Sequence, residues 1–306
     1  MLGRQETAAT FRMQRTLRNT IGCVGIGLRT GAKVSLALHP AEVGSGIRFV
    51  RYDQAEARPI PARFDQVCAT VEGVTLGDPG GPVVASIEHL MAALAICEID
   101  NVLVEVGGPE VPVMDGSAAP FVFLLECAGV IEQDRPACCI EVLRRIEVGE
   151  HGGSACLEPA ERLELCCEIV RQEAPVSSRG LCLPFDPDRF KNDIAAARDP
   201  GAAAGRGRLW STALPHGVAG MGRANGQGVA AGDCADEALC HELLDSLSDL
   251  NLCGGRLIGR FTARAADHSL RLRLLRTFFA DPTAWRIVDD DLPADREPPR
   301  RRAVGA

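Results

Sequence analysis

Hydrophobic and polar residues alternate along several short segments of the chain, and this two-residue period is typical of half-buried β-strands. In 16–40, Val34, Leu36 and Leu38 alternate with polar or small residues beyond a glycine-rich turn, so we expect two strands there. The segment 101–108 alternates in the same way. Further strands are expected in 139–149, 154–160, 162–170 and the first part of 256–279.

Other segments follow the 3.6-residue period of a helix. Five apolar residues of 86–99 fall on one helical face, and Ser86 stands where an N-cap is expected. A second helix should follow the turn signalled by the sequence Asp-Gly-Ser at 115–117. Later helices are expected in 186–198, in 236–252, which precedes a glycine pair, and at the end of 256–279.

Strands and helices therefore recur in a similar order in both halves of the chain, which predicts an α+β fold with two domains. No repeat of individual residues is obvious. The glycine- and alanine-rich segment 199–235 could be either a loop over a site or an eroded stretch of sequence. We place the domains at 11–132 and 138–288, with a linker at 133–139 and loose termini at 1–10 and 289–306.

Composition limits the classes of function. The 306 residues are 46% hydrophobic and 24% charged, which is ordinary for a globular protein. The formal net charge of −8 argues against nucleic-acid binding, which needs a basic surface. We recognise no signal peptide and no transmembrane segment of ~20 apolar residues. The 13 cysteines include no C-x-x-C motif, so we expect free, mostly buried thiols and a cytoplasmic location.

Histidines beside carboxylates supply the candidate chemistry. His241 and Asp245 are four residues apart, so they project from one face of a helix, and Asp249 follows one turn later. Glu88 directly precedes His89 on another predicted helix. Two histidines and one carboxylate can hold a zinc ion and leave one coordination position open for water. By spacing alone, each pair is more often an ordinary solvated or ion-paired couple on a helix.

Five segments of the chain are distinctive: GIGLRTGAKV, SIEHLMAAL, EVPVMDGSAAPF, HELLDSLSDL and IGRFTARAADHSL. In order and approximate spacing they resemble motifs of the zinc-dependent UDP-3-O-acyl-N-acetylglucosamine deacetylases of lipid A synthesis, over roughly residues 12–286. The resemblance implies two similar domains, each a small β-sheet layered with α-helices, with the active site between them. By motif position it implies zinc ligands at His89, His241 and Asp245. Ferrous iron is an alternative metal, because nitrogen and oxygen ligands accept both.

The same resemblance assigns roles to three further residues. Glu88 corresponds to the general base that deprotonates the attacking water. His268 corresponds to a protonated histidine that stabilises the oxyanion or protonates the leaving amine, and Asp249 to the carboxylate that orients it. The implied reaction removes the N-acetyl group of a small nucleotide-sugar lipid precursor, UDP-3-O-acyl-N-acetylglucosamine.

Four positions depart from the family pattern. Arg29 replaces a histidine near the substrate, and Glu242 replaces a lysine associated with the substrate phosphate, so a charge is reversed. Asp199 and Pro200 stand where a threonine and a phenylalanine are expected. Three interpretations stay open: the working deacetylase, a paralogue that acts on another N-acyl sugar, and a zinc-stabilised binding or regulatory module with little or no turnover. The retained metal ligands, base and acid favour catalysis.

Overall fold

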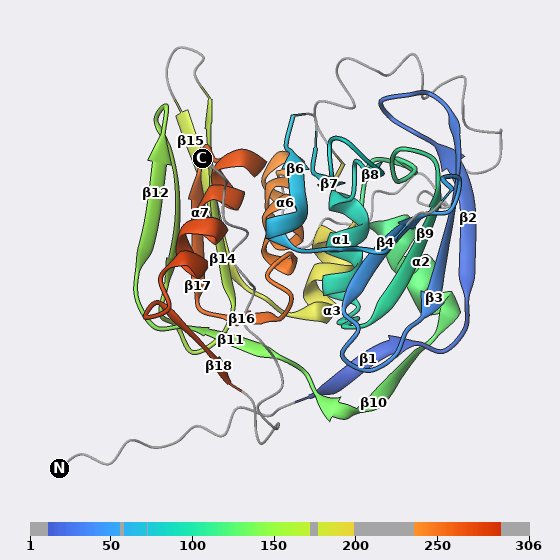
Figure 1. Ribbon diagram of the computed structural model, residues 1–306. Coiled ribbons are helices and arrows are strands. Elements are labelled where there is room, and N and C mark those ends of the chain that lie inside the picture. The colour runs from blue at the N-terminus through green and yellow to red at the C-terminus, as the bar shows by residue number, and fades with distance from the viewer. Residues whose placement is uncertain (1–11, 56–57, 72, 172–176, 199–235, 289–306) are drawn as a thin grey trace.

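The computed structural model describes residues 12–55, 58–71, 73–171, 177–198 and 236–288. Two five-stranded sheets form the outer layers, and the longer helices lie between them (Figure 1). This mixed architecture agrees with the α+β class predicted from the sequence.

The first half of the chain is built mainly of short strands, with two helices of nine and ten residues. Its elements, in chain order, are β1 (Met13–Leu17), β2 (Ile21–Ile26), β3 (Lys33–Pro40), β4 (Ile47–Arg51), β5 (Ile60–Pro61), the 3₁₀ turn η1 (Phe64–Gln66), β6 (Val67–Ala69), β7 (Thr75–Gly77), β8 (Val83–Val84), α1 (Glu88–Ile96), β9 (Val102–Gly107), α2 (Ala119–Ala128) and β10 (Val130–Pro136).

The second half has longer strands and two longer helices. Its elements are β11 (Cys139–Val142), β12 (Ile146–Glu150), β13 (Gly153–Glu158), β14 (Glu164–Arg171), β15 (Ser177–Pro184), α3 (Pro187–Arg189), the π-helical turn η2 (Phe190–Ile194), α6 (Glu237–Asn251), β16 (Arg256–Ile258), β17 (Arg260–Arg264), α7 (His268–Ala280) and β18 (Trp285–Val288).

The two large sheets share one strand order. That order is β2-β3-β9-β4-β5 in the first sheet and β12-β13-β17-β14-β15 in the second. In both sheets the third and fourth strands run parallel, whereas all other neighbours are antiparallel. The central strand follows one helix and precedes another in each half: α1 and α2 flank β9, and α6 and α7 flank β17. The two halves therefore repeat a topology that their individual residues do not reveal.

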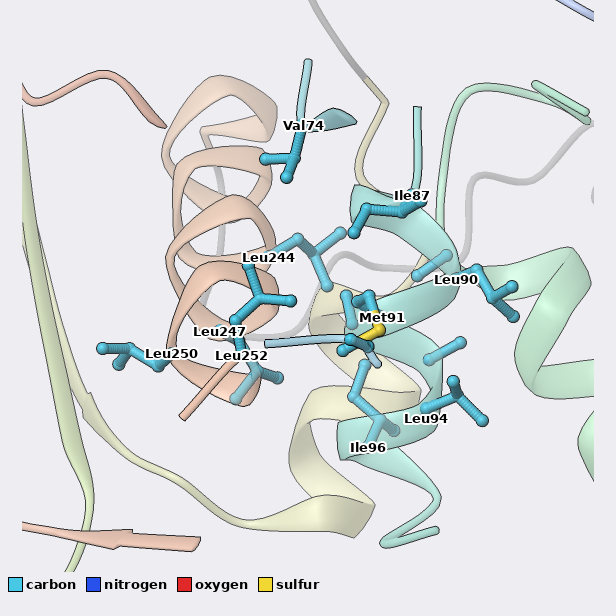
Figure 2. Close-up of a cluster of buried hydrophobic side chains, with 14 of the residues drawn as sticks. Val74, Ile87, Leu90, Met91, Leu94, Ile96, Leu244, Leu247, Leu250 and Leu252 are labelled. Atoms are coloured by element: carbon cyan, nitrogen blue, oxygen red, sulfur yellow. The ribbon is translucent and has the colours of Figure 1, made fainter. Parts of the chain in front are cut away.

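The helix α1 lies in the centre of the molecule, against α2 and α6. Its segment 90–94 is buried on every side, which is why this helix is apolar all round rather than along one stripe. Figure 2 shows Leu90, Met91 and Leu94 of α1 in one cluster with Leu244 and Leu247 of α6. Burying each such side chain contributes roughly 1.5–3 kcal/mol. This packing holds the two helices that carry the histidines of the candidate site.

Several sequence predictions are confirmed in detail, and four are wrong. Val34, Leu36 and Leu38 are buried along β3 as their alternation predicts. The expected linker 133–139 is wrong, because its first residues belong to β10, whose backbone pairs with β1. Ser86 does not cap α1: the N-cap is the next residue along the chain, and Ser86 itself adopts φ +56°.

The predicted helix at 186–198 is also wrong in its length. The chain forms only the short α3, which Asp186 caps, and the π-helical turn η2 there. In η2 the hydrogen bonds join residues five apart, as from the Ala195 N–H to the Phe190 carbonyl, so the α-helix does not continue. The expectation of free thiols fails for Cys166 and Cys182, which are direct cross-strand partners on β14 and β15 and form a disulfide. The pairing of these strands could not be known from sequence. Free thiols occur at Cys23, Cys68, Cys97, Cys127, Cys156, Cys167 and Cys253.

Candidate metal centre

Two helices from different halves of the chain bring three candidate metal ligands together. His89 lies in the first turn of α1, while His241 and Asp245 lie one turn apart on α6. Their nearest nitrogen and oxygen donor atoms all lie within 4.8 Å of one another. The two imidazole rings meet edge to face, with centroids 5.3 Å apart. Two nitrogens and one oxygen in this arrangement fit a zinc ion with an open coordination position.

The ring of His241 is oriented from its far side. Its Nδ1 lies 3.2 Å from the carbonyl oxygen of Ala197 and can donate a hydrogen bond to it. Its Nε2, the ring nitrogen left to bind a metal, faces Asp245 Oδ1 at 3.6 Å. A backbone acceptor of this kind fixes both the tautomer and the angle of a metal-binding imidazole. Burial raises the pKa of Asp245, but the neighbouring histidines and Arg271 outweigh it and hold the pKa below its usual range.

Glu88 lies at the start of α1, beside His89. The backbone N–H of Val74 donates to Glu88 Oε2 at 3.2 Å. Burial raises the pKa of Glu88 to about 7. The charge of His268 acts to lower this pKa, and the charge of Asp245 acts to raise it. The carboxylate touches Gly73: a Cβ at that position would lie only 2.6 Å from Glu88 Oε1. Only glycine fits there without a shift of the carboxylate.

His268 and Asp249 form a directly bonded pair. Asp249 has no exposed surface, and its Oδ2 accepts a hydrogen bond from His268 Nδ1 at 2.8 Å. The other ring nitrogen, Nε2, lies 3.7 Å from Asp245 Oδ2 and so faces the candidate metal centre. Burial alone would lower the pKa of His268, but Asp249 and Asp245 outweigh it and raise the pKa to about 9. The imidazole is therefore protonated at neutral pH.

The structure adds one charged residue that sequence analysis missed. Arg271 on α7 is only 2% exposed, and its Nε donates to Asp249 Oδ2 at 2.7 Å. Its Nη1 donates to Glu242 Oε1 at 2.5 Å, and its Nη2 lies 4.0 Å from Asp245 Oδ2. The signal available in the sequence was the spacing from His268: residues three apart share a helix face.

Two of the four positions that depart from the family pattern, Glu242 and Arg29, lie in the described part of the chain, and each has a side-chain partner. The Glu242 carboxylate is paired with buried Arg271, so the charge reversal at this position is compensated inside the protein. Arg29 is exposed, and its Nη1 donates to Thr75 Oγ1 at 3.4 Å, one residue beyond the backbone N–H that binds Glu88. Asp199 and Pro200 lie outside the described residues.

Comparison with known proteins identifies the family of this chain. The family profile described as "LpxC: UDP-3-O-acyl N-acetylglycosamine deacetylase" matches residues 14–280. The chain belongs to the LpxC family. The resemblance expected from the five motifs is thereby confirmed, and the family is one of zinc-dependent amidohydrolases.

Individual members of the LpxC family are similar along almost the whole chain. The UDP-3-O-acyl-N-acetylglucosamine deacetylase of Myxococcus xanthus (strain DK1622) is 37% identical over 283 residues, which cover 90% of this chain and 89% of the relative. The enzyme of the same name from Phenylobacterium zucineum (strain HLK1) is 36% identical and covered to 96%. That from Shewanella oneidensis is 35% identical over 293 residues, 92% of this chain and 94% of the relative. No helix in the described part of the chain combines the length and apolarity needed to cross a membrane.

Proposed function

We propose that this protein hydrolyses the N-acetyl group of UDP-3-O-acyl-N-acetylglucosamine in lipid A biosynthesis. The observation that carries the proposal is the convergence of His89, His241 and Asp245, with Glu88 and His268 beside them, in a chain of the LpxC family. Membership of this family also supports a cytoplasmic location and a small nucleotide-sugar lipid precursor as the ligand.

We assign the metal to His89, His241 and Asp245. The set combines two imidazole nitrogens with a carboxylate whose pKa is held below its usual range, so the carboxylate is ionised and able to bind a cation at neutral pH. These nitrogen and oxygen donors suit zinc and also accept ferrous iron. When bound, the metal acidifies a water molecule and polarises the amide carbonyl.

Glu88 is the proposed general base. Its carboxylate is held by the Val74 N–H on one side and restricted by Gly73 on the other, so the proton acceptor has a fixed position. A pKa of about 7 matches the acceptor to neutral pH, because a base acts best when its pKa is close to the working pH.

His268 is the proposed proton donor. Asp249 accepts from Nδ1, which keeps the ring charged and directs Nε2 toward Asp245 and the metal centre. A charged imidazole there can donate a hydrogen bond to the developing oxyanion and then pass its Nε2 proton to the leaving amine. Loss of one such donor typically costs about 10²–10³ in kcat.

We further propose that the two halves are domains, at 11–132 and 138–288, with the active site between them. The shared strand order supports this division, and so does the origin of His89 in the first half and of His241 and Asp245 in the second. The termini at 1–10 and 289–306 lie outside the described residues.

Deacetylation assays on purified protein separate the candidate functions. Turnover of UDP-3-O-acyl-N-acetylglucosamine supports the proposal, turnover only of other acetamido sugars supports a paralogue, and one zinc per chain without turnover supports a binding module. His241→Ala should lose zinc, whereas Glu88→Ala should keep zinc and lose activity. His151→Ala is the matched control, because that side chain is 90% exposed on a hairpin. Full activity of Glu88→Ala would show that the base is assigned wrongly.

A further inference from the structure

The guanidinium of Arg271 is buried in the wall of the proposed active site. Of the proposed reacting groups it lies against His268, with Nη2 3.3 Å from Nδ1 of that imidazole. Its Nε and Nη1 donate to two carboxylates, those of Asp249 and Glu242. Nη1 also donates to the carbonyl oxygen of Ala266 at 2.6 Å. A buried cation is stable only where carboxylates and other acceptors replace its hydration.

Asp249 is held from two sides by these contacts. Its Oδ2 accepts from His268 Nδ1 at 2.8 Å and from Arg271 Nε at 2.7 Å. Its Oδ1 is buried and has no hydrogen-bond partner among the described residues. No described residue holds the Asp249 carboxylate at Oδ1. The hydrogen bond from Arg271 Nε to Oδ2 therefore restrains its rotation. An unrestrained carboxylate would leave the imidazole ring free to turn with it.

We propose that Arg271 is a positioning residue for the pair formed by His268 and Asp249, and that Glu242 holds Arg271 in place. Glu242 projects from α6 next to His241, and its carboxylate is 23% exposed. It thereby ties α7, which carries His268 and Arg271, to α6, which carries the proposed metal ligands. Glu242 serves the interior of the protein rather than facing the substrate with an unpaired negative charge.

The inference rests on the proposed deacetylase function, and the assay is the same. Arg271→Gln should lower kcat about 10- to 100-fold, the usual cost of losing a group that orients a catalytic residue. KM should change little and zinc should stay at one per chain, because Arg271 binds no substrate in this scheme and approaches the proposed metal donors only through Nη2, 4.0 Å from Asp245 Oδ2. Arg271→Lys should recover only part of kcat, since an ammonium lacks the planar fork that reaches two carboxylates.

Position 242 tests the second half of the proposal. Glu242→Gln should lower kcat less than Arg271→Gln does. Combining the two should be no worse than Arg271→Gln alone, because residues in one network give non-additive losses. Glu242→Lys should lower both kcat and the melting temperature more than Glu242→Gln, since it places a second cation against Arg271. Arg273→Gln is the matched control: it lies on the same helix, is 40% exposed, and pairs with Glu150 away from the site.

Three results would overturn the inference. They are a wild-type kcat in Arg271→Gln, a loss confined to KM or zinc content, and strictly additive losses in the double variant. A gain of activity in Glu242→Lys would also refute it, because residue 242 would then face the substrate. If Arg271→Gln does not fold, the variant that combines Arg271→Gln with Glu242→Gln is measured instead, because it removes both charges of the pair, and its kcat should be lowered about 10- to 100-fold. An inactive wild-type protein would instead refute the proposed function.

Discussion

Gly73 offers a direct test of how precisely Glu88 must be placed. The residue adopts φ +102°, and a Cβ added to it would lie 2.6 Å from Oε1 and 3.1 Å from Cδ of Glu88. Ordinary contact begins at 3.4 Å, so in Gly73→Ala the carboxylate must move by roughly 0.8 Å or the loop must open by as much.

The expected cost has two parts. Displacement of a reacting group by about 1 Å can reduce the rate about 10²-fold, so kcat should fall by roughly that factor. The positive φ, which suits glycine, should also cost about 1–3 kcal/mol of stability once a side chain is present. Zinc content should stay unchanged, because the three atoms nearest to the added Cβ all belong to Glu88 rather than to a proposed metal ligand.

Gly152→Ala separates the two parts of this cost. Gly152 also has a positive φ, +84°, but a Cβ added to it would meet no atom within 4 Å, and it lies in the turn between β12 and β13. Steady-state kinetics and thermal unfolding should show similar losses of stability in the two variants, with kcat lowered only in Gly73→Ala. A wild-type kcat for Gly73→Ala would refute the placement of Glu88 as the base.

Two further predictions concern the core and the pH profile. Leu244→Ala should cost about 2–5 kcal/mol of unfolding free energy, because this fully buried side chain fills the contact between α1 and α6; denaturant unfolding should show a much smaller loss for Leu143→Ala, which is 40% exposed. The ratio kcat/KM should rise with pH as Glu88 loses its proton at about 7, or lower once a metal cation lies nearby, and fall as His268 loses its proton at about 9. A pH–rate profile with no alkaline fall would contradict the role of His268.

Much of the fold followed from local patterns. The alternation at Val34, Leu36 and Leu38 identified a strand with one buried face, and the helical spacing of apolar residues in 86–99 identified a helix. The linker at 133–139 was misplaced because polar residues on an edge strand look the same as a linker when the partner strand is unknown. Ser86 looked like an N-cap by residue type, but a cap also needs an extended backbone, whereas Ser86 has a φ of +56° and the N-cap position falls one residue later.

In the candidate site too, some residues could be predicted from their spacing in the sequence and others could not. The pair His241 and Asp245 shares one helix, so its spacing predicted a common face. His89 lies more than a hundred residues earlier, and no spacing rule could bring it to the same point. The family motifs supplied that link, and its physical origin is the packing of α1 on α6 through a shared apolar core (Figure 2).

Arg271 escaped prediction for a different reason. It belongs to a run in which Arg271, Arg273 and Arg276 alternate with leucines, and each looks like a solvated residue on a helix. Only the direction from which α6 approaches α7 decides which of them is buried, and that direction places Asp249 and Glu242 opposite Arg271 while Arg273 stays exposed. The same packing explains why a glutamate is suitable at 242: once an arginine is buried beside it, a lysine there would leave two cations facing each other. Positions 242 and 271 should therefore change together when this site is altered, and neither can be judged from its own residue type.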